Sequence, residues 1–511
     1  MRWFVVGLPA AILAGTTGGC AVGPHYQRPV APADAGYAPA PLPDRSASAE
    51  VHCGEMQHLV AGRDIVFEWW ELFESPALDS LIKKAFKANP TVAAAQAALA
   101  QAQELVYAQQ GFFYPTVSAD FQAERHKVSG NTNSSSTIGV QGNGQNLLPA
   151  LEDPHRQPHN LPSYYTFYTA EVSVGFVPDV LGQNRRQVES LAAQKDAQRF
   201  ALEATYITLA SNVVGAAIQE ASLRGQIKAT CEIIEADEKS LRILRDQFRL
   251  GSAMRIDVAA QEAALAAIQA TLPPLEKALE QTRDLMRALV GQLPNEEEAT
   301  FELDALQLPP EVPLSLPAKI IEQRPDVRAA EAQLHAANAE VGVAVAAMLP
   351  QFSITGQYGG NATQIPWMFR HGGPFWSLYG SVNQPLFQGG TLWHQERAAR
   401  EALKQAAAQY QSTVIAAYQN VADTLHLSLS DADTLAADVE AEKSAKVTYD
   451  LTRRQAEAGY VDTLTLLNAE MAYQQALLNR VQAQATRYGD TVALFQALGG
   501  GWWNRREVAA K

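Results

Sequence analysis

Two stretches of 68 residues, 183–250 and 391–458, contain no proline, and they constrain the possible fold of this chain more than any other feature. The first has only Gly215 and Gly225 in its interior, and the second has no glycine at all. Because proline breaks a helix and glycine weakens it, each stretch predicts one very long helix. A continuous helix of this length measures roughly 100 Å, several times the length of an average helix.

The first long stretch also carries a heptad pattern. Stepping alternately by four and three residues from Leu202 to Phe248 gives 14 positions, of which 11 are apolar or aromatic. With 47% hydrophobic residues overall, about seven would be expected by chance. The excess predicts a coiled-coil seam. In the second stretch the spacing is clear only from Leu403 to Val421, and no single register stands out downstream.

The two long stretches belong to an internal repeat. Residues 89–99 match residues 324–334 at an offset of 235, and a second block matches at an offset of 208. The offset falls because the first half carries a longer insert at roughly 129–163. This period is far too long for a solenoid, so we expect a duplicated unit of about 200 residues. The matched positions are Pro90, Val92, Ala95, Leu99, Gly251, Glu262 and Gly291 with Pro325, Val327, Ala330, Leu334, Gly459, Glu470 and Gly499.

Short alternating segments precede the long helix of each unit. Apolar and polar residues alternate in four of them, 117–123, 170–176, 352–355 and 376–383. A period of two predicts β-strands, and a polar loop separates the two strands of each pair. One apolar face and one polar face is also the pattern of the wall of a water-filled membrane barrel.

Helices are expected to open and to close each unit. The opening helices are predicted at 90–110 and 325–348. After Gly251 and Gly459 the chain turns back into a shorter helix, because glycine suits a helix end. Pro273-Pro274 is expected to kink the first of these return helices. Each unit is therefore a strand pair that carries a long antiparallel helical hairpin.

The expected fold class is α+β, mainly α, with four transmembrane strands and two long coiled-coil hairpins in an internally duplicated chain. Four strands cannot close a membrane barrel alone, since the smallest barrels use about eight. Unpaired strand edges are not tolerated in lipid, and beyond the N-terminus no run of 18 or more apolar residues offers a spanning helix. The strands are therefore expected to be shared between several copies, and the hairpins to continue the barrel as a tube.

The N-terminus has the layout of a targeting segment. Arg2 precedes a short apolar run at 3–14, and small residues lead to Cys20. This is the arrangement of a bacterial lipoprotein signal, in which the cysteine becomes lipidated. Such signals usually carry leucine three residues before the cysteine, where this chain has Thr17, so ordinary secretion with cleavage nearby is the alternative. Ala21 is compatible with sorting to the outer membrane.

These features divide the chain into five segments. Each repeat is expected to follow the order helix, strand, strand, long helix, return helix. The segments are a signal peptide at 1–19, a lipidated N-terminal segment at 20–77, a first repeat at 78–300, a second repeat at 301–500 and a C-terminal tail at 501–511.

Five motifs spread along the chain make it resemble the outer membrane factors, the TolC family, and specifically the NodT-type lipoprotein branch. The resemblance implies a homotrimer with twelve strands in the outer membrane and a helical tunnel in the periplasm. It also implies two partners, a periplasmic adaptor protein and an inner-membrane pump, in a system that exports drugs, metals or proteins. The motifs are CAVGPHYQRP at 20–29, WWELFESPAL at 69–78, Asn89-Pro90, Arg324-Pro-Asp326 and QPLFQGG at 384–390.

The residues just after the hairpin turns at Gly251 and Gly459 are the candidate periplasmic gate. They are Arg255 and Asp257 in the first hairpin, and Asp462 and Asn468 in the second. In TolC-type proteins, acidic residues around this turn ring the closed entrance, and ion pairs help to hold it shut. Asp257 matches such a position by its spacing, whereas Asn468 stands where relatives often have aspartate. The alternative for Asp257 and Asp462 is that each favours a helix N-terminus.

Charge and motifs argue against other functional classes. The net charge of −14 argues against a nucleic-acid partner, because phosphate binding needs a basic surface. The sequence has no G-x-S-x-G, no H-E-x-x-H and no phosphate-binding glycine loop. We therefore expect neither an enzyme nor a cofactor beyond the lipid on Cys20. The rival to a channel is a lipid-anchored structural coiled-coil protein of the envelope without a pore, which would need no strands.

One short segment contains several possible ligands for a soft metal ion. They are His52, Cys53, Met56 and His58. A solvated loop is the preferred interpretation, and no metal site is predicted, because none of the three cysteines has zinc-type spacing. Trp69 and Trp70 are expected to pack as a structural anchor.

Overall fold

The computed structural model describes residues 21–30, 36–39, 43–127, 164–296, 299–314 and 317–505. The chain divides into two compact units, each made of three separate segments. Unit 1 comprises 1–26, 103–193 and 335–405, and unit 2 comprises 27–102, 194–334 and 406–511. Both long helices begin in unit 1 and continue in unit 2.

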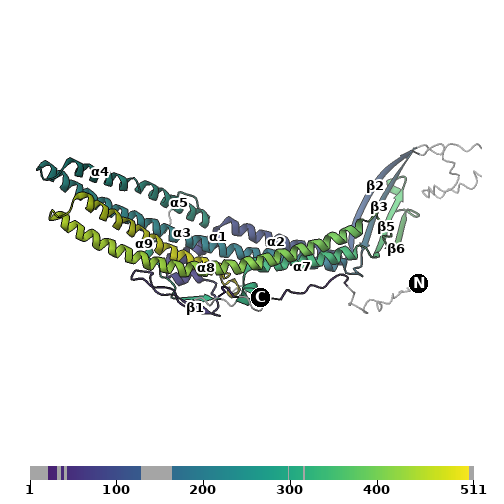
Figure 1. The fold of residues 1–511 in the computed structure, drawn as a ribbon. Helices are drawn as coiled ribbons and strands as arrows, with labels where there is room; N and C mark the ends of the chain where they lie inside the picture. Colours follow the sequence, from purple (N-terminus) through teal and green to yellow (C-terminus); the bar gives the residue numbers. More distant parts are fainter. Residues whose placement is uncertain are drawn as a thin grey trace, which may run out of the picture. The chain divides into compact units, whose positions relative to one another are not determined.

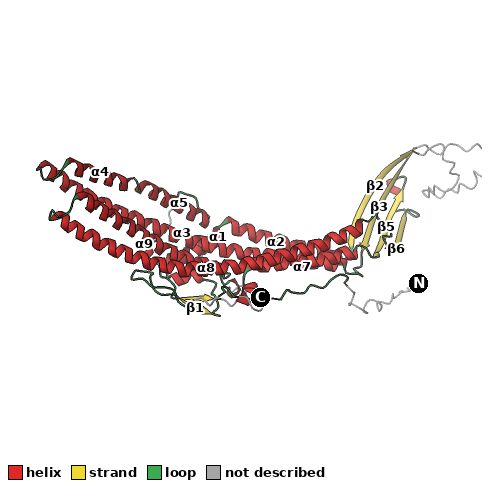
Figure 2. Ribbon diagram, viewed as in Figure 1, coloured by secondary structure: helices red, strands yellow, loops and turns green. Residues whose placement is uncertain are grey.

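Unit 1 contains a four-stranded antiparallel sheet (Figure 1). Its strands are β2 (Thr116–Lys127), β3 (Tyr164–Phe176), β5 (Gln351–Ala362) and β6 (Pro374–Asn383). All four alternating segments are therefore strands, as predicted, and Figure 2 shows them together. The order is β2-β3-β5-β6, so β3 and β5 pair in the centre while β2 and β6 lie at the edges.

A helix precedes each strand pair. These helices are α2 (Pro90–Gln110) and α7 (Pro325–Ala346), and each begins with a proline. Proline suits the first helical position because its missing N–H would have no partner there. The prediction for α2 is confirmed at both ends, and α7 ends two residues before the predicted 348.

Each strand pair leads into one helix of 67 residues. These are α3 (Gln183–Arg249) and α8 (Thr391–Glu457), which confirms both predicted long helices to within one residue. Both end at a glycine in the left-handed region, Gly251 and Gly459, each with φ of 78°. In both, the amide of the residue after the glycine donates to the carbonyl five residues back, at 2.9 Å. This is the hydrogen-bond pattern of a helix terminated by glycine.

In unit 2 the chain turns back after each long helix. The first hairpin returns through α4 (Arg255–Gln269) and α5 (Leu272–Val290), and the second through α9 (Thr463–Ala497). The predicted kink is a full break between α4 and α5. The break precedes Pro273 and Pro274 because both prolines occupy the first turn of α5, where no intrahelical donor is needed.

The heptad positions of α3 form the predicted seam. Ten of the 11 apolar positions are buried or half-buried, and only Phe248 at the end is largely exposed. The three polar positions, Glu220, Thr230 and Asp237, are buried as well. The amide of Phe301 donates to Glu220 at 2.8 Å, and Gln261 donates to Asp237 at 3.3 Å. The Thr230 hydroxyl bonds the carbonyl four residues back, so every polar position has a partner.

One window of 18 residues in α3 is apolar enough, with a mean hydropathy of 1.3, to meet the length and composition of a membrane span. Within this chain 61% of that window is buried. Packing in the coiled coil therefore accounts for its apolar character.

An aromatic core in unit 2 holds the N-terminal segment against α9. Trp69 stacks on Phe495 with ring centroids 5.2 Å apart, and the Trp70 indole donates to Asp79 at 3.1 Å. Both tryptophans are buried, which confirms the predicted anchor. The surrounding elements are β1 (His58–Ala61) paired in parallel with β4 (Glu311–Leu314), α1 (Pro76–Ala88), α6 (Pro317–Gln323) and the short 3-10 helices Trp69–Phe73, Leu303–Ala305 and Trp502–Asn504.

Candidate functional site

The sheet of unit 1 has one apolar face that is exposed in the single chain. The register places Val172 of β3 beside Ala119 of β2 and Tyr358 of β5, and Tyr358 beside Trp376 of β6. Trp376 is 76% exposed, although large apolar side chains are usually buried. A contiguous exposed apolar surface of this kind indicates contact with another apolar phase or partner. The face consists of Val117, Ala119, Phe121, Ala123, Ala170, Val172, Val174, Ile354, Tyr358, Trp376, Leu378 and Val382.

The opposite face of the sheet is polar. Its serines bond across strands, with Ser118 and Ser173 at 2.7 Å and Ser353 and Ser381 also at 2.7 Å. Charged and amide side chains fill the same face, including Asp120, Gln122, Glu124, Glu171 and Gln357. The two faces of the sheet therefore differ sharply in polarity.

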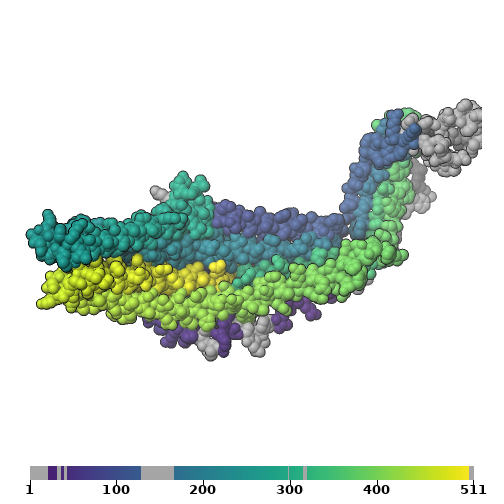
Figure 3. Space-filling view, turned by 45° about the horizontal axis from the view of Figure 1, so that its top comes forward, coloured from purple at the N-terminus to yellow at the C-terminus, as the bar shows by residue number. Residues whose placement is uncertain are grey.

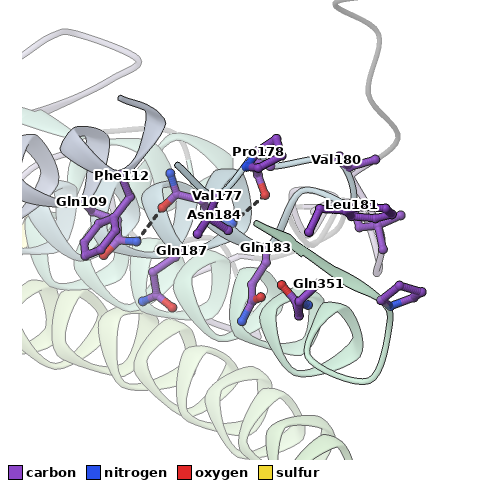
Figure 4. A pocket seen from close by; sticks show the side chains of 13 residues that line it. Gln109, Phe112, Val177, Pro178, Val180, Leu181, Gln183, Asn184, Gln187 and Gln351 are labelled. Carbon is purple, nitrogen blue, oxygen red and sulfur yellow. Dashed lines mark hydrogen bonds between the residues drawn. The ribbon is translucent and has the colours of Figure 1, made fainter. Parts of the chain in front are cut away.

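A small pocket lies where the strands of unit 1 give way to helices, as Figure 4 shows. Its volume is about 220 Å³, and amide side chains such as Gln109 and Asn184 dominate its polar lining. Gln109 donates to Asn184 at 2.6 Å, while Asp179 accepts from the amides of Asn184 and Arg185 at 3.0 and 2.9 Å. The polar groups thus fix the turn from β3 into α3, and the lining contains no nucleophile paired with a base.

The chain that follows Cys20 is bound at this strand–helix junction of unit 1. Cys20 itself lies outside the described residues. The amide of Val22 donates to Leu181 at 3.3 Å, and Arg186 donates to the carbonyl of Val22 at 3.0 Å. Further along, the Tyr26 ring stacks on His335 with centroids 4.2 Å apart. The first described residues therefore have a fixed place beside the base of the sheet.

The tips of the two hairpins lie next to each other in unit 2, as Figure 3 shows in teal and yellow-green. Asp257 accepts a hydrogen bond from the amide of Met254 at 3.0 Å, and Asp462 accepts one from the amide of Thr465 at 2.9 Å. Hydrogen bonds from Thr465 hold the pKa of Asp462 below its ordinary value. Both aspartates therefore cap the start of a return helix, as the helix-start interpretation expects.

The other two candidate gate residues lie apart from these caps. Arg255 is exposed, and no ion pair joins it to Asp257 in the part of the chain that the structure describes. Asn468 is exposed beside a groove of about 490 Å³ that Thr230, Ile268 and Gln474 also line. The single chain thus places the four predicted gate residues at the tips without joining them into one cluster.

Of the possible metal ligands, Cys53 is buried in the core of unit 2, whereas His52 and His58 are half-buried and Met56 is exposed, so the expected solvated loop is wrong for Cys53. Cys53 is 1% exposed, and its thiol contacts the Tyr488 hydroxyl. Burial raises the pKa of Cys53 to about 12, so the thiol stays protonated near neutral pH and is a poor metal ligand. Arg487, which the sequence did not single out, is also buried and donates to the carbonyl of Cys53 at 3.2 Å. These contacts indicate a structural role.

Comparison with known proteins places the chain in one protein family. The family model described as outer membrane efflux protein matches residues 81–292 and 316–500. The pyoverdine export outer membrane protein OpmQ of Pseudomonas putida is 27% identical over 439 residues, which are 85% of this chain and 88% of OpmQ. The probable efflux pump outer membrane protein TtgC of the same species is 27% identical over 503 residues, which are 98% of this chain and 96% of TtgC.

Solved structures share the fold. The outer-membrane channel OprN has a TM-score of 0.79 at 24% identity, covering 94% of this chain and all of OprN. The open state of the MtrE outer membrane channel of Neisseria gonorrhoeae has a TM-score of 0.76 at 21% identity, covering 96% of this chain and all of MtrE. At these identities the likeness concerns the fold.

Proposed function

Because the chain belongs to the outer membrane efflux protein family, we propose that it is the outer-membrane channel subunit of a tripartite export system. It is an efflux transport protein of the outer membrane, as are the relatives that match nearly its whole length. The observation that carries the channel function is the sheet of unit 1, whose exposed apolar face opposes a polar face.

Three copies would complete a barrel that one chain cannot form. The four strands of one chain leave β2 and β6 with one neighbour each among the described strands. Edges of this kind need a partner strand in lipid, so β2 of one copy would pair with β6 of the next. Twelve strands then close one barrel, with the apolar faces toward lipid and the polar faces toward a water-filled lumen. The repeated element order also supports the proposal that the chain is a duplicated unit.

The helical hairpins would continue the lumen into the periplasm. A tube of coiled-coil hairpins from three copies brings the tips to its periplasmic mouth, where a periplasmic adaptor protein and an inner-membrane pump deliver substrate. Relatives named as outer-membrane proteins of efflux pumps support these partners. At the other end, lipid on Cys20 would anchor the N-terminal segment that is bound beside the base of the sheet.

The structural rival, a lipid-anchored coiled coil without a pore, is disfavoured by the same sheet. A scaffold has no need for four strands with a large exposed apolar face, because water around that face would be unfavourable. The coiled-coil seam alone fits both functions. The sheet fits only the channel.

Protein extracted from the outer membrane with detergent is expected to be a trimer. Pairing of the strand edges and burial of the hairpin faces both require neighbouring copies. Native mass spectrometry of the full chain measures the number of copies directly. A monomer that stays soluble after the detergent is removed would contradict the shared barrel.

Charge at the hairpin tips is expected to set the resting conductance. If Arg255 and Asp257 join neighbouring hairpins at the mouth, Asp257→Ala loosens the mouth and raises single-channel conductance in a planar bilayer. The effect shrinks in high salt, because ions screen exposed charges. Asn468→Asp adds three charges in a trimer and is expected to increase cation selectivity if residue 468 faces the lumen.

A matched variant separates the charge of Asp257 from its capping hydrogen bond. Asp257→Asn keeps an oxygen that accepts from the Met254 amide but removes the charge. A gate held by charge predicts that both variants raise conductance. A cap alone predicts that Asp257→Ala costs about 1 kcal/mol of local stability and that neither variant changes conductance.

A further inference from the structure

Two carboxyl groups meet in the interior of unit 2, between the two hairpins. Asp237 lies on α3 of the first hairpin and is 1% exposed, while Glu470 lies on α9 of the second and is 6% exposed. Their side chains are in hydrogen-bonding contact with each other. Apart from Glu470, no donor among the described residues reaches Asp237 Oδ2. Two carboxyl groups can hydrogen-bond to each other only when one of them carries a proton.

Among the residues that the structure describes, no positively charged side chain forms an ion pair with Asp237 or Glu470. From α4, the uncharged Gln261 donates to Asp237 at 3.3 Å, and from α8 the Tyr449 hydroxyl donates to Glu470 at 3.5 Å. Arg453 of α8 is a cation that acts on Glu470, and it lies over the Tyr449 ring at 5.7 Å. Arg453 also pairs with two acids of its own helix, at 3.7 and 3.9 Å. Its charge is therefore shared with other groups.

The residue that aligns with Glu470 in the first half of the chain has a different partner. Glu470 aligns with Glu262, and Arg453 aligns with Arg245, at the offset of 208 that joins the two hairpin turns. In the first hairpin Glu262 and Arg245 form an ordinary ion pair at 2.8 Å. In the second hairpin the glutamate instead turns to Asp237 of the other hairpin. The first hairpin thus has an ion pair between its own two helices, whereas Glu470 of the second hairpin contacts the other hairpin.

We propose that Asp237 and Glu470 are a proton-held latch that ties the second hairpin to the first near the periplasmic tips. The contact itself does not depend on the proposed channel function. Its consequence does, because we expect the latch to control how easily the periplasmic mouth of the channel opens. When the shared proton leaves, two negative charges face each other in a buried site, and α9 is repelled from α3.

The direction of the pH effect follows from the pair itself. Burial and the neighbouring Asp237 raise the pKa of Glu470 to about 8, and burial also raises the pKa of Asp237. The two groups titrate as a pair. A group whose pKa is raised in the closed form stabilises that form fully below its ordinary pKa, near 4.5 for glutamate. This stabilisation is lost as the pH rises toward 8 and is absent above it.

Hydrogen exchange of the detergent-extracted protein tests the latch without any channel measurement. The protection factors of amides in 463–478 are followed from pH 5 to pH 9, each corrected for the intrinsic pH dependence of exchange. For the wild type, protection is expected to fall by up to about tenfold per pH unit and to level off near pH 8. Glu470→Gln is expected to abolish this fall, because its amide donates to Asp237 without titrating.

Two variants act as controls. Glu262→Gln breaks the aligned ion pair with Arg245, and it is expected to keep the wild-type pH response of 463–478. Asp237→Asn removes the other half of the latch and is expected to behave as Glu470→Gln does, which covers the case in which Glu470→Gln fails to assemble. A flat wild-type profile would overturn the latch. So would an unchanged pH response in both latch variants.

Single-channel recordings separate the latch from the channel function. If pores form and open more readily as the pH rises in the wild type but not in Glu470→Gln, the latch controls the mouth. If no pores form while exchange shows the pH response, the channel function is wrong and the latch stands. If pores form without any pH response in exchange, the latch is wrong and the channel stands.

Discussion

Replacing Val172 with arginine is expected to prevent assembly of the protein in the outer membrane, whereas the same change at Ser173 is expected to leave assembly intact. Val172 lies on the apolar face, beside Ala119 and Tyr358, and is 44% exposed in the single chain. An arginine on the lipid side of a barrel costs about 2–4 kcal/mol near the middle of the bilayer. A trimer incurs that cost three times.

The adjacent residue makes a matched control. Ser173 lies on the polar face, where it bonds Ser118 at 2.7 Å, so an arginine there would enter the water-filled lumen. The measurement is the amount of trimer recovered from the outer-membrane fraction for each variant. Ser173→Arg is expected to assemble and to shift ion selectivity toward anions. Equal recovery of both variants would contradict the assignment of the two faces, and loss of Ser173→Arg alone would reverse it.

Cys20→Ala is expected to abolish lipid labelling completely. Cys20 is the position at which the signal pattern places the modified cysteine, and the residues after it are bound at the base of the sheet. Incorporation of labelled palmitate into the protein in growing cells measures the effect. Because Cys20 is the one predicted lipidation residue, the result is expected to be all-or-none.

The exposed Cys231 provides the control for labelling. It lies on α3 in unit 2, and Cys231→Ala is expected to leave palmitate incorporation unchanged. Labelling that persists in Cys20→Ala would show that another residue carries the lipid. An unlabelled wild type would favour ordinary secretion, which the Thr17 position of the signal leaves open.

The helix boundaries were predictable wherever a glycine or a proline marks the end or the start of a helix. Glycine ends α3 and α8 in the left-handed region, and proline begins α2 and α7, so these boundaries fell within one or two residues. The four strands followed from alternation of apolar and polar residues. The heptad of α3 identified its buried face, including the polar position Asp237.

In α8 the heptad pattern of the sequence did not identify the buried positions beyond Val421. The buried positions continue beyond Val421 at Leu425, Ser428, Ala432 and Leu435, but the step from Val421 to Leu425 is a second consecutive step of four, which shifts the heptad by one residue. The register was lost in the sequence because serine and alanine are common at exposed positions too. Side-chain size and packing, rather than hydrophobicity, decide such positions.

Contacts between distant residues were beyond local patterns. The pairing of β3 with β5 in the centre of the sheet joins strands that are far apart in the sequence. The contact between Asp237 and Glu470 arises in the same way, and the repeat alignment gave only a hint by pairing Glu470 with Glu262. The candidate gate residues follow the two hairpin turns, and their gate role stays a prediction because a ring of charges requires the other copies of the chain.

Planar-bilayer recording of the purified full-length protein tests the channel function most directly. Purified trimer is expected to insert and to produce discrete conductance steps of uniform size, each from one twelve-stranded barrel with a water-filled lumen. A trimer that inserts into the bilayer but carries no ionic current would contradict the channel and would favour the structural scaffold.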